Sequence, residues 1–116
     1  MCIRDRSITE KFGTPCFIYS KAALENNYLA YSQAFEGHPH LICFAVKANS
    51  NLAVLNVLAN LGAGFDIVSG GELSRVLAAG GNPNKIIFSG LGKTTAEICE
   101  GLDAGCLLYT SPSPRD

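Results

Sequence analysis

Short apolar runs alternate with helix-like segments through the middle of the chain. Residues 41–46, 65–68 and 86–89 form apolar runs of strand length without strict polar alternation. This pattern is typical of strands that are covered on both faces in a parallel sheet. A further run at residues 16–19 predicts a short strand nearer the amino terminus.

Helical patterns lie between these runs. Residues 51–61 and 71–79 carry apolar side chains on neighbouring turns, and each segment is followed by glycine, a common signal for the end of a helix. Thr94 and Glu97 have the spacing of a capping box, which predicts that a helix begins there. Upstream, Ser20 is placed to cap a helix whose apolar positions are Leu24, Tyr28, Tyr31 and Phe35.

The two ends of the chain differ from the middle. Residues 1–6, MCIRDR, and residues 106–116, CLLYTSPSPRD, resemble translations of a transposase-end sequencing adaptor, the first read forward and the second as its reverse complement. Because the two matches flank the remainder as library adaptors would, we interpret both as adaptor-derived segments and exclude them from fold reasoning. We expect the protein's own sequence at residues 7–105. The alternative for the carboxyl-terminal segment is a natural disordered tail.

Repeated strand–helix units predict an α/β fold. Such units build either a doubly wound sheet or a (β/α)8 barrel, and about three of them cannot close a barrel, which takes eight. The alternatives are a small open sheet or a piece of a larger barrel, and the adaptor-like ends favour the piece. We therefore expect residues 7–105 to be the amino-terminal part of a TIM barrel.

Charge and cysteine content exclude several classes of protein. Residues 7–105 hold six basic and eight acidic side chains, so there is no basic footprint for nucleic acid and no polybasic membrane patch. No apolar run approaches a membrane span. Cys16, Cys43 and Cys99 show no metal or disulfide spacing, and His38 and His40 flank a proline in a turn-like stretch. We expect a cytoplasmic protein without a metal site.

Lys47 is the candidate for chemistry, because it follows the apolar run at the strand end where barrel enzymes carry their active sites. A partly desolvated lysine there supplies the neutral amine that a Schiff base requires. On position alone, an alternative of equal weight is a lysine whose aliphatic stem lies on apolar surface.

The stretch SGGEL, residues 69–73, opens a helix after a strand. Its backbone amides can either bind an anion or form only a tight connection between strand and helix, and we favour the connection.

A resemblance to a known family decides for chemistry at Lys47. The stretches TPCFIYS, HPHLICFAVKANSNLAVL, GAGFDIVSGGEL and VLAAGGNPNKIIFSGLGKT resemble the opening of the diaminopimelate decarboxylases, fold-type III enzymes that use pyridoxal 5'-phosphate. The resemblance covers residues 13–102. It implies a barrel of the alanine-racemase-like type, entered from a second, β-rich domain.

The resemblance also implies an activity and a set of site residues. In AVKAN the family's lysine, here Lys47, holds the cofactor as an internal aldimine, and the reaction converts meso-2,6-diaminopimelate to L-lysine and carbon dioxide. Asp66, at the tip of the next strand, is placed by the resemblance near this lysine; the equal alternative is a carboxylate that only caps the following turn. The resemblance implies a homodimer for the full-length enzyme.

The rest of the family's pocket is expected beyond residue 105. The phosphate loop, the partner of the pyridine nitrogen and the substrate-reading residues are all absent from this stretch, so we expect the isolated chain to be inactive. Two alternatives stay open: another fold-type III decarboxylase of the ornithine or arginine type, and a non-catalytic barrel relative that binds the cofactor or a partner.

Overall fold

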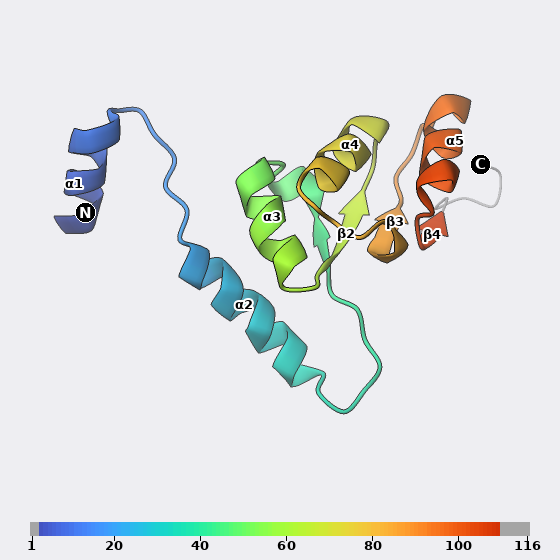
Figure 1. The fold of residues 1–116 in the computed structure, drawn as a ribbon, viewed down its shortest axis with the longest axis horizontal. Helices are drawn as coiled ribbons and strands as arrows, with labels where there is room; N and C mark the ends of the chain where they lie inside the picture. The colour runs from blue at the N-terminus through green and yellow to red at the C-terminus, as the bar shows by residue number, and fades with distance from the viewer. Residues whose placement is uncertain (1–2, 110–116) are drawn as a thin grey trace.

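The computed structural model describes residues 3–109, which form an elongated α/β layer measuring 53 × 37 × 23 Å. A single layer of strands carries helices along its length, and one helix stands apart at the amino terminus (Figure 1). The elements in chain order are α1 (Ile3–Phe12), α2 (Lys21–Ala34), β1 (Cys43–Ala45), the 3-10 turn η1 (Val46–Ala48), α3 (Leu52–Asn60), β2 (Gly64–Ile67), α4 (Gly70–Ala78), the 3-10 turn η2 (Pro83–Lys85), β3 (Ile86–Phe88), α5 (Thr95–Ala104) and β4 (Leu108–Tyr109).

The sheet has four parallel strands in the order β1-β2-β3-β4. Each strand pairs with the next one in the sequence, and the helices between them contact one another in the same order, α3 with α4 and α4 with α5. A doubly wound sheet reverses its strand order at a switch point, whereas this sheet proceeds in one direction, as a barrel wall does. The predicted α/β class and the partial barrel are confirmed.

The three predicted βα units are confirmed as β1–α3, β2–α4 and β3–α5. A fourth, short strand was not expected, because we excluded residues 106–116 from fold reasoning; β4 lies in that segment and pairs with β3. The backbone amide of Leu107 donates to the carbonyl of Ile86 at 2.8 Å, and Cys106 is buried. A ladder joins backbone groups, so a short apolar segment of any origin can occupy the edge of a sheet.

The core lies between the sheet and its helices. The side chains of Phe65, Ile67, Ile86 and Phe88 are fully buried, and they meet a second set from α3 and α4 that includes Leu55, Leu58, Leu73 and Val76. Because side chains alternate across a strand, the residues between them, Asp66 and Ile87, face the opposite side of the sheet. That opposite side corresponds to the inside of a barrel.

Helix caps follow the sequence signals closely. Ser20 and Thr94 cap α2 and α5 as predicted, and α5 shows the complete capping box with Glu97. The helices predicted at residues 51–61 and 71–79 are confirmed as α3 and α4. Asn51 and Ser69 cap these two helices through their side-chain oxygens.

The amino-terminal prediction was wrong at residues 16–19, which form no strand. Phe17 is 91% exposed there, and no described segment pairs with this stretch. A strand exists only where a neighbour accepts its backbone hydrogen bonds, and this stretch lacks one.

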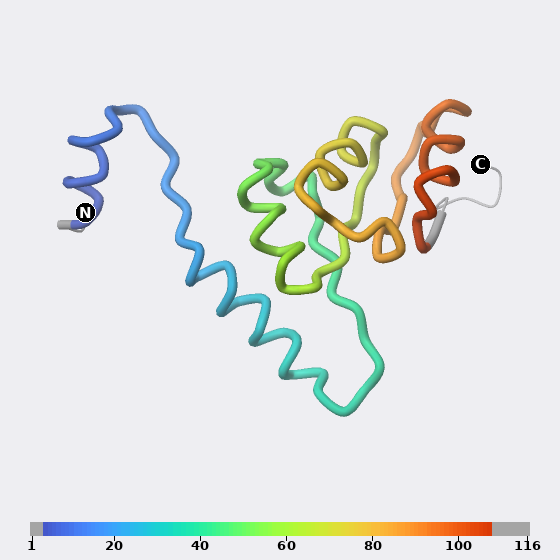
Figure 2. Tube along the Cα trace, viewed as in Figure 1, coloured from blue at the N-terminus to red at the C-terminus, as the bar shows by residue number. Residues whose placement is uncertain are grey.

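Helix α1, which we did not predict, crosses the boundary between residues 6 and 7, and it lies away from the sheet together with the segment that follows it (Figure 2). None of the helices described is long and apolar enough to span a membrane.

Candidate functional site

Lys47 lies two residues beyond β1, in the turn η1. Its neighbour Val46 is fully buried on the helix side of the sheet, and the amide of Asn49 donates to the Val46 carbonyl at 3.1 Å, which closes the turn. Anchoring Val46 directs the next side chain away from the core. The prediction that Lys47 stands at the carboxyl end of the strand is confirmed, but the expected partial desolvation is not found, because the Lys47 side chain is exposed in the structure of residues 3–109.

Asp66 lies on the neighbouring strand and is held by a second side chain. In the register of the sheet Asp66 pairs with Ala45, two residues before Lys47. The Ser89 hydroxyl, just beyond the end of β3, donates to Asp66 Oδ1 at 2.6 Å. Asp66 is half-buried, and its carboxylate is tied to β3 rather than to its own following turn. The alternative of a simple turn cap is therefore not supported by the hydrogen bonds described for Asp66.

The turn between β2 and α4 uses its amides internally. The amide of Val68 donates to Glu72 Oε2 at 2.8 Å, that of Gly70 to Glu97 Oε1 at 3.1 Å, and that of Glu72 to Ser69 Oγ at 3.2 Å. Two of these acceptors are carboxylates, which repel an anion. The interpretation of SGGEL as a tight connection therefore fits the structure better than anion binding.

Lys47 and this turn share one surface depression of about 390 Å³. Glu72 and Arg75 contribute the other charged side chains of its lining, and the guanidinium of Arg75 donates to the Ser50 carbonyl at 3.2 Å. Ser50 follows η1, so this hydrogen bond joins α4 to the segment that carries Lys47. We did not predict Glu72 and Arg75 as site residues from the sequence. The signal that could have found them is their position on the first two turns of a helix that begins at the carboxyl end of a strand.

The other lysines of the βα units occupy different surroundings. Lys85 lies at the opposite end of the strands, where its Nζ donates to the Gly62 carbonyl at 3.1 Å beyond the end of α3. Lys93 follows β3, and its Nζ donates to the Gly90 carbonyl at 2.7 Å and lies 5.8 Å from the centre of the Phe88 ring. Only Lys47 lines the depression beside α4.

Cys43 lies on the same face of the sheet as Asp66. Burial raises the pKa of the Cys43 thiol, and the nearby Asp66 carboxylate raises it further. The Cys43 thiol lies 4.0 Å from the Lys85 carbonyl. A raised pKa keeps the thiol protonated and therefore a poor nucleophile, so Cys43 is a packing residue of the inner face.

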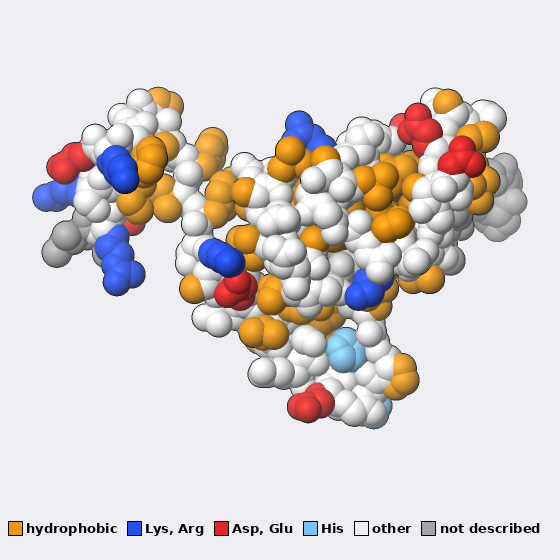
Figure 3. Space-filling view, viewed as in Figure 1, with side chains coloured by type: hydrophobic (Ala, Val, Ile, Leu, Met, Phe, Trp, Pro, Cys, Tyr) orange, Lys and Arg blue, Asp and Glu red, His pale blue; other side chains and the backbone are white. Residues whose placement is uncertain are grey.

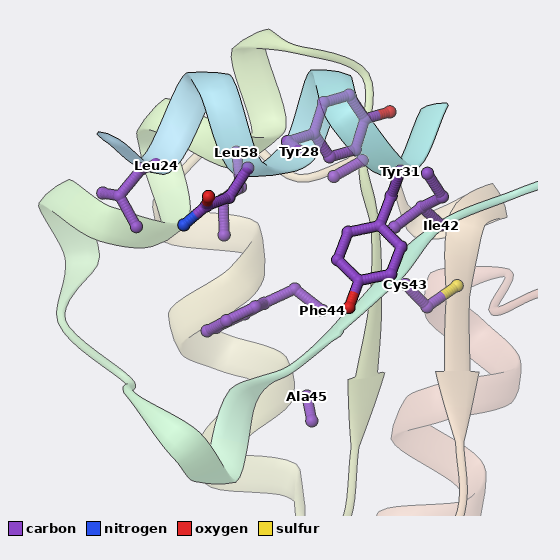
Figure 4. Close-up of a pocket in the computed structure, with 10 residues that line it drawn as sticks. Leu24, Tyr28, Tyr31, Ile42, Cys43, Phe44, Ala45 and Leu58 are labelled. Carbon is purple, nitrogen blue, oxygen red and sulfur yellow. The ribbon is translucent and has the colours of Figure 1, made fainter. Parts of the chain in front are cut away.

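A second, apolar groove runs along β1 and α2. It has a volume of about 440 Å³, and Tyr28 and Tyr31 of α2 lie across it from Phe44 and Ala45 (Figure 4). Among the described residues, no charged side chain lines this groove. It lies along the edge of β1 that has no partner strand among the described residues, and it offers packing surface rather than reactive groups.

Charged side chains are scattered over the surface. On the face drawn in Figure 3, acidic and basic side chains form no single patch, and apolar side chains are exposed between them. Within residues 3–109 no group of three or more His, Cys, Asp or Glu side chains has an arrangement that could hold a metal ion.

Comparison with known families identifies the class of protein to which this chain belongs. The family model described as "pyridoxal-dependent decarboxylase, pyridoxal binding domain" matches residues 21–111. The chain belongs to this family.

Within the family, the chain is similar to diaminopimelate decarboxylases. It is 64% identical over 99 residues to the enzyme of Pseudomonas fluorescens and 64% identical over 109 residues to that of Pseudomonas aeruginosa. These alignments cover 85% and 94% of this chain but only 24% and 26% of the relatives. The chain thus spans about a quarter of the length of the curated relatives it matches.

Solved structures agree in fold. The diaminopimelate decarboxylase of Helicobacter pylori complexed with L-lysine matches with a TM-score of 0.84 at 41% identity, over 91% of this chain and 28% of that one. The lysine/ornithine decarboxylase of Vibrio vulnificus complexed with cadaverine matches with a TM-score of 0.86 at 23% identity, over 97% of this chain and 30% of that one, which is a likeness of fold.

Proposed function

We propose that this chain is part of the cofactor-binding barrel of a decarboxylase that converts meso-2,6-diaminopimelate to L-lysine and carbon dioxide. The observation that carries the proposal is the exposed Lys47 amine at the carboxyl end of β1, in a chain of the pyridoxal-dependent decarboxylase family. The names of the two relatives at 64% identity support the choice of substrate. The reaction belongs to the full-length protein, since this chain spans about a quarter of those relatives.

The residues of the chain fit pyridoxal phosphate in part. Lys47 offers an accessible primary amine for the cofactor's aldehyde, and the open face beside it carries Asp66, held by Ser89. The turn after β2 is not suited to the phosphate, because its amides are bonded to Glu72, Glu97 and Ser69. We infer that the phosphate is held by another part of the full-length protein.

Lys47 and Asp66 have separate parts in this proposal. The Lys47 Nζ would be the group that holds pyridoxal phosphate, through the aldehyde carbon of the cofactor. Bound pyridoxal phosphate supplies a ring that accepts the electron pair left when carbon dioxide departs. Asp66 is paired in the sheet with Ala45, two residues before Lys47, and is held by Ser89, so its carboxylate would orient the Lys47 amine as a hydrogen-bond acceptor.

An adduct experiment tests the assignment of Lys47. In the full-length protein, borohydride reduction after loading with pyridoxal phosphate should leave a pyridoxyl group on the Lys47 peptide. The matched variant Lys47→Arg keeps the charge and should lose the adduct. An adduct that maps to Lys85 or Lys93 instead would refute the assignment.

A substrate panel distinguishes the alternatives. Carbon dioxide release from meso-diaminopimelate supports the proposal, release from ornithine or arginine alone supports a relative of that type, and cofactor binding without release from any of the three supports a non-catalytic relative. The fold shared with the lysine/ornithine enzyme of Vibrio vulnificus does not separate these cases.

The remaining expectations are proposals of the same kind. We propose that the full-length protein is a cytoplasmic homodimer that binds no nucleic acid. We also propose that residues 7–105 are its own sequence and that residues 1–6 and 106–116 derive from adaptors. Light scattering of the purified full-length protein tests the dimer.

A further inference from the structure

Glu97 joins two neighbouring βα units. Its carboxylate accepts from the Thr94 amide through Oε2 at 2.9 Å, which forms the capping box of α5, and from the Gly70 amide through Oε1 at 3.1 Å, at the beginning of α4. A capping box requires only the first of these bonds. The second reaches across to the turn that carries Glu72 into the depression beside Lys47.

The contact between α5 and Gly70 is close. A Cβ at position 70 would lie 2.8 Å from Glu100 Oε2 and 3.3 Å from Glu97 Cγ, although Gly70 has an ordinary helical backbone rather than a positive φ. The close neighbours of position 70 are thus side chains of α5: a Cβ there would displace the exposed Glu100 side chain and press on Glu97. By contrast, a Cβ at Gly71 would meet only Ser69 Oγ, at 3.9 Å.

We propose that Glu97 is a positioning residue that fixes the turn of residues 68–72 against Lys47. The inference rests on the proposed function of Lys47. One Glu97 oxygen caps α5 and the other secures the Gly70 amide; within the secured turn, the Val68 amide binds Glu72 Oε2. The Glu72 carboxylate is thereby held in the depression that Lys47 lines, with Arg75 as the other charged lining residue and Asp66 on the adjacent strand.

The substitution Glu97→Gln separates the two bonds. Glutamine also completes a capping box, but it has one acceptor oxygen where glutamate has two, so it cannot serve both amides. We expect α5 to keep its cap and the Gly70 amide to lose its acceptor. Asp103→Asn, on the exposed surface of the same helix, removes an equal charge and is the matched control.

Hydrogen exchange in the cofactor-free, full-length protein gives the first readout. Loss of one hydrogen bond should speed exchange at Gly70 by roughly 2- to 10-fold in Glu97→Gln, with no change in Asp103→Asn. Gly70→Ala, whose Cβ would lie 3.3 Å from Glu97 Cγ and press on that side chain, should also speed exchange at the Val68 and Glu72 amides. Unchanged exchange in Glu97→Gln overturns the bridge between the two units.

The second readout concerns Lys47 itself. Lys47 and the turn line the same depression, so a loosened turn should change the visible circular dichroism of the cofactor bound at Lys47. A lower melting temperature with an unchanged cofactor spectrum shows that Glu97 is only structural and overturns the positioning role. A failure of the Lys47 adduct in the unsubstituted protein refutes the proposed function instead, and the exchange result at Gly70 is independent of it.

Discussion

Replacing Gly64 by alanine should destabilise the sheet directly beneath the candidate site. A Cβ at this position of β2 would lie 2.5 Å from the Lys85 carbonyl oxygen and 2.7 Å from Cys43 Sγ. The Lys85 oxygen belongs to the backbone, so β3 must move away from β2 by about half an ångström to restore a contact of 3.0 Å. Overpacking of this kind costs about 1–3 kcal/mol.

Gly71→Ala is the matched control, because a Cβ there has only an ordinary contact with Ser69 Oγ. Alanine in a helix reduces the entropy of the unfolded chain and should stabilise by about 0.4–1 kcal/mol. Urea unfolding of the full-length protein, followed by circular dichroism, should therefore move the midpoint in opposite directions for the two variants. An unchanged midpoint for Gly64→Ala, or an equal loss in both variants, would refute the steric argument.

Three further predictions concern reactivity, origin and association. Iodoacetamide should label Cys43 more slowly than the exposed Cys16 and Cys99, because the raised pKa of the Cys43 thiol moves thiolate formation to higher pH. Asp66→Asn removes a charge that raises this pKa and should speed the labelling of Cys43. Sequencing of an unfragmented amplicon should show that the parent reading frame encodes neither MCIRDR nor CLLYTSPSPRD, and finding either string in the genome would end the adaptor interpretation. The isolated chain should self-associate in light scattering and release no carbon dioxide from meso-diaminopimelate, because the edge of β1 has no partner strand among the described residues; a monomer with turnover would contradict this.

The elements were predictable where local signals determine them. Side-chain oxygens at Ser20 and Thr94 cap the helices that the sequence indicated, and the apolar runs became β1, β2 and β3. Residues 16–19 have the composition of a strand but no partner, and β4 has a partner but no distinctive composition. Both errors arise because strand formation depends on a neighbour that composition does not reveal.

The position of Lys47 was predictable and its environment was not. Lys47 directly follows an apolar run, so a strand at that run puts Lys47 at its carboxyl end, where barrel enzymes carry their active sites. The structure places Lys47 there. Its exposure depends on what lies over the turn, and nothing within residues 3–109 covers it. Desolvation of the Lys47 side chain depends on all the segments packed around it in a barrel. The sequence of one strand and the residue after it therefore cannot predict this desolvation.

Hydrogen bonds between residues far apart in the sequence were not predicted. Ser89 bonds to Asp66 from 23 residues away, and Glu97 bonds to Gly70 from 27 residues away. The capping box already accounts for a glutamate at position 97, which left no reason to seek a second partner. Yet a carboxylate has two oxygens, and the hydrogen bonds that form the cap use only one of them. The other oxygen is available for a tertiary contact, and parallel βα units bring the start of the preceding helix within its reach.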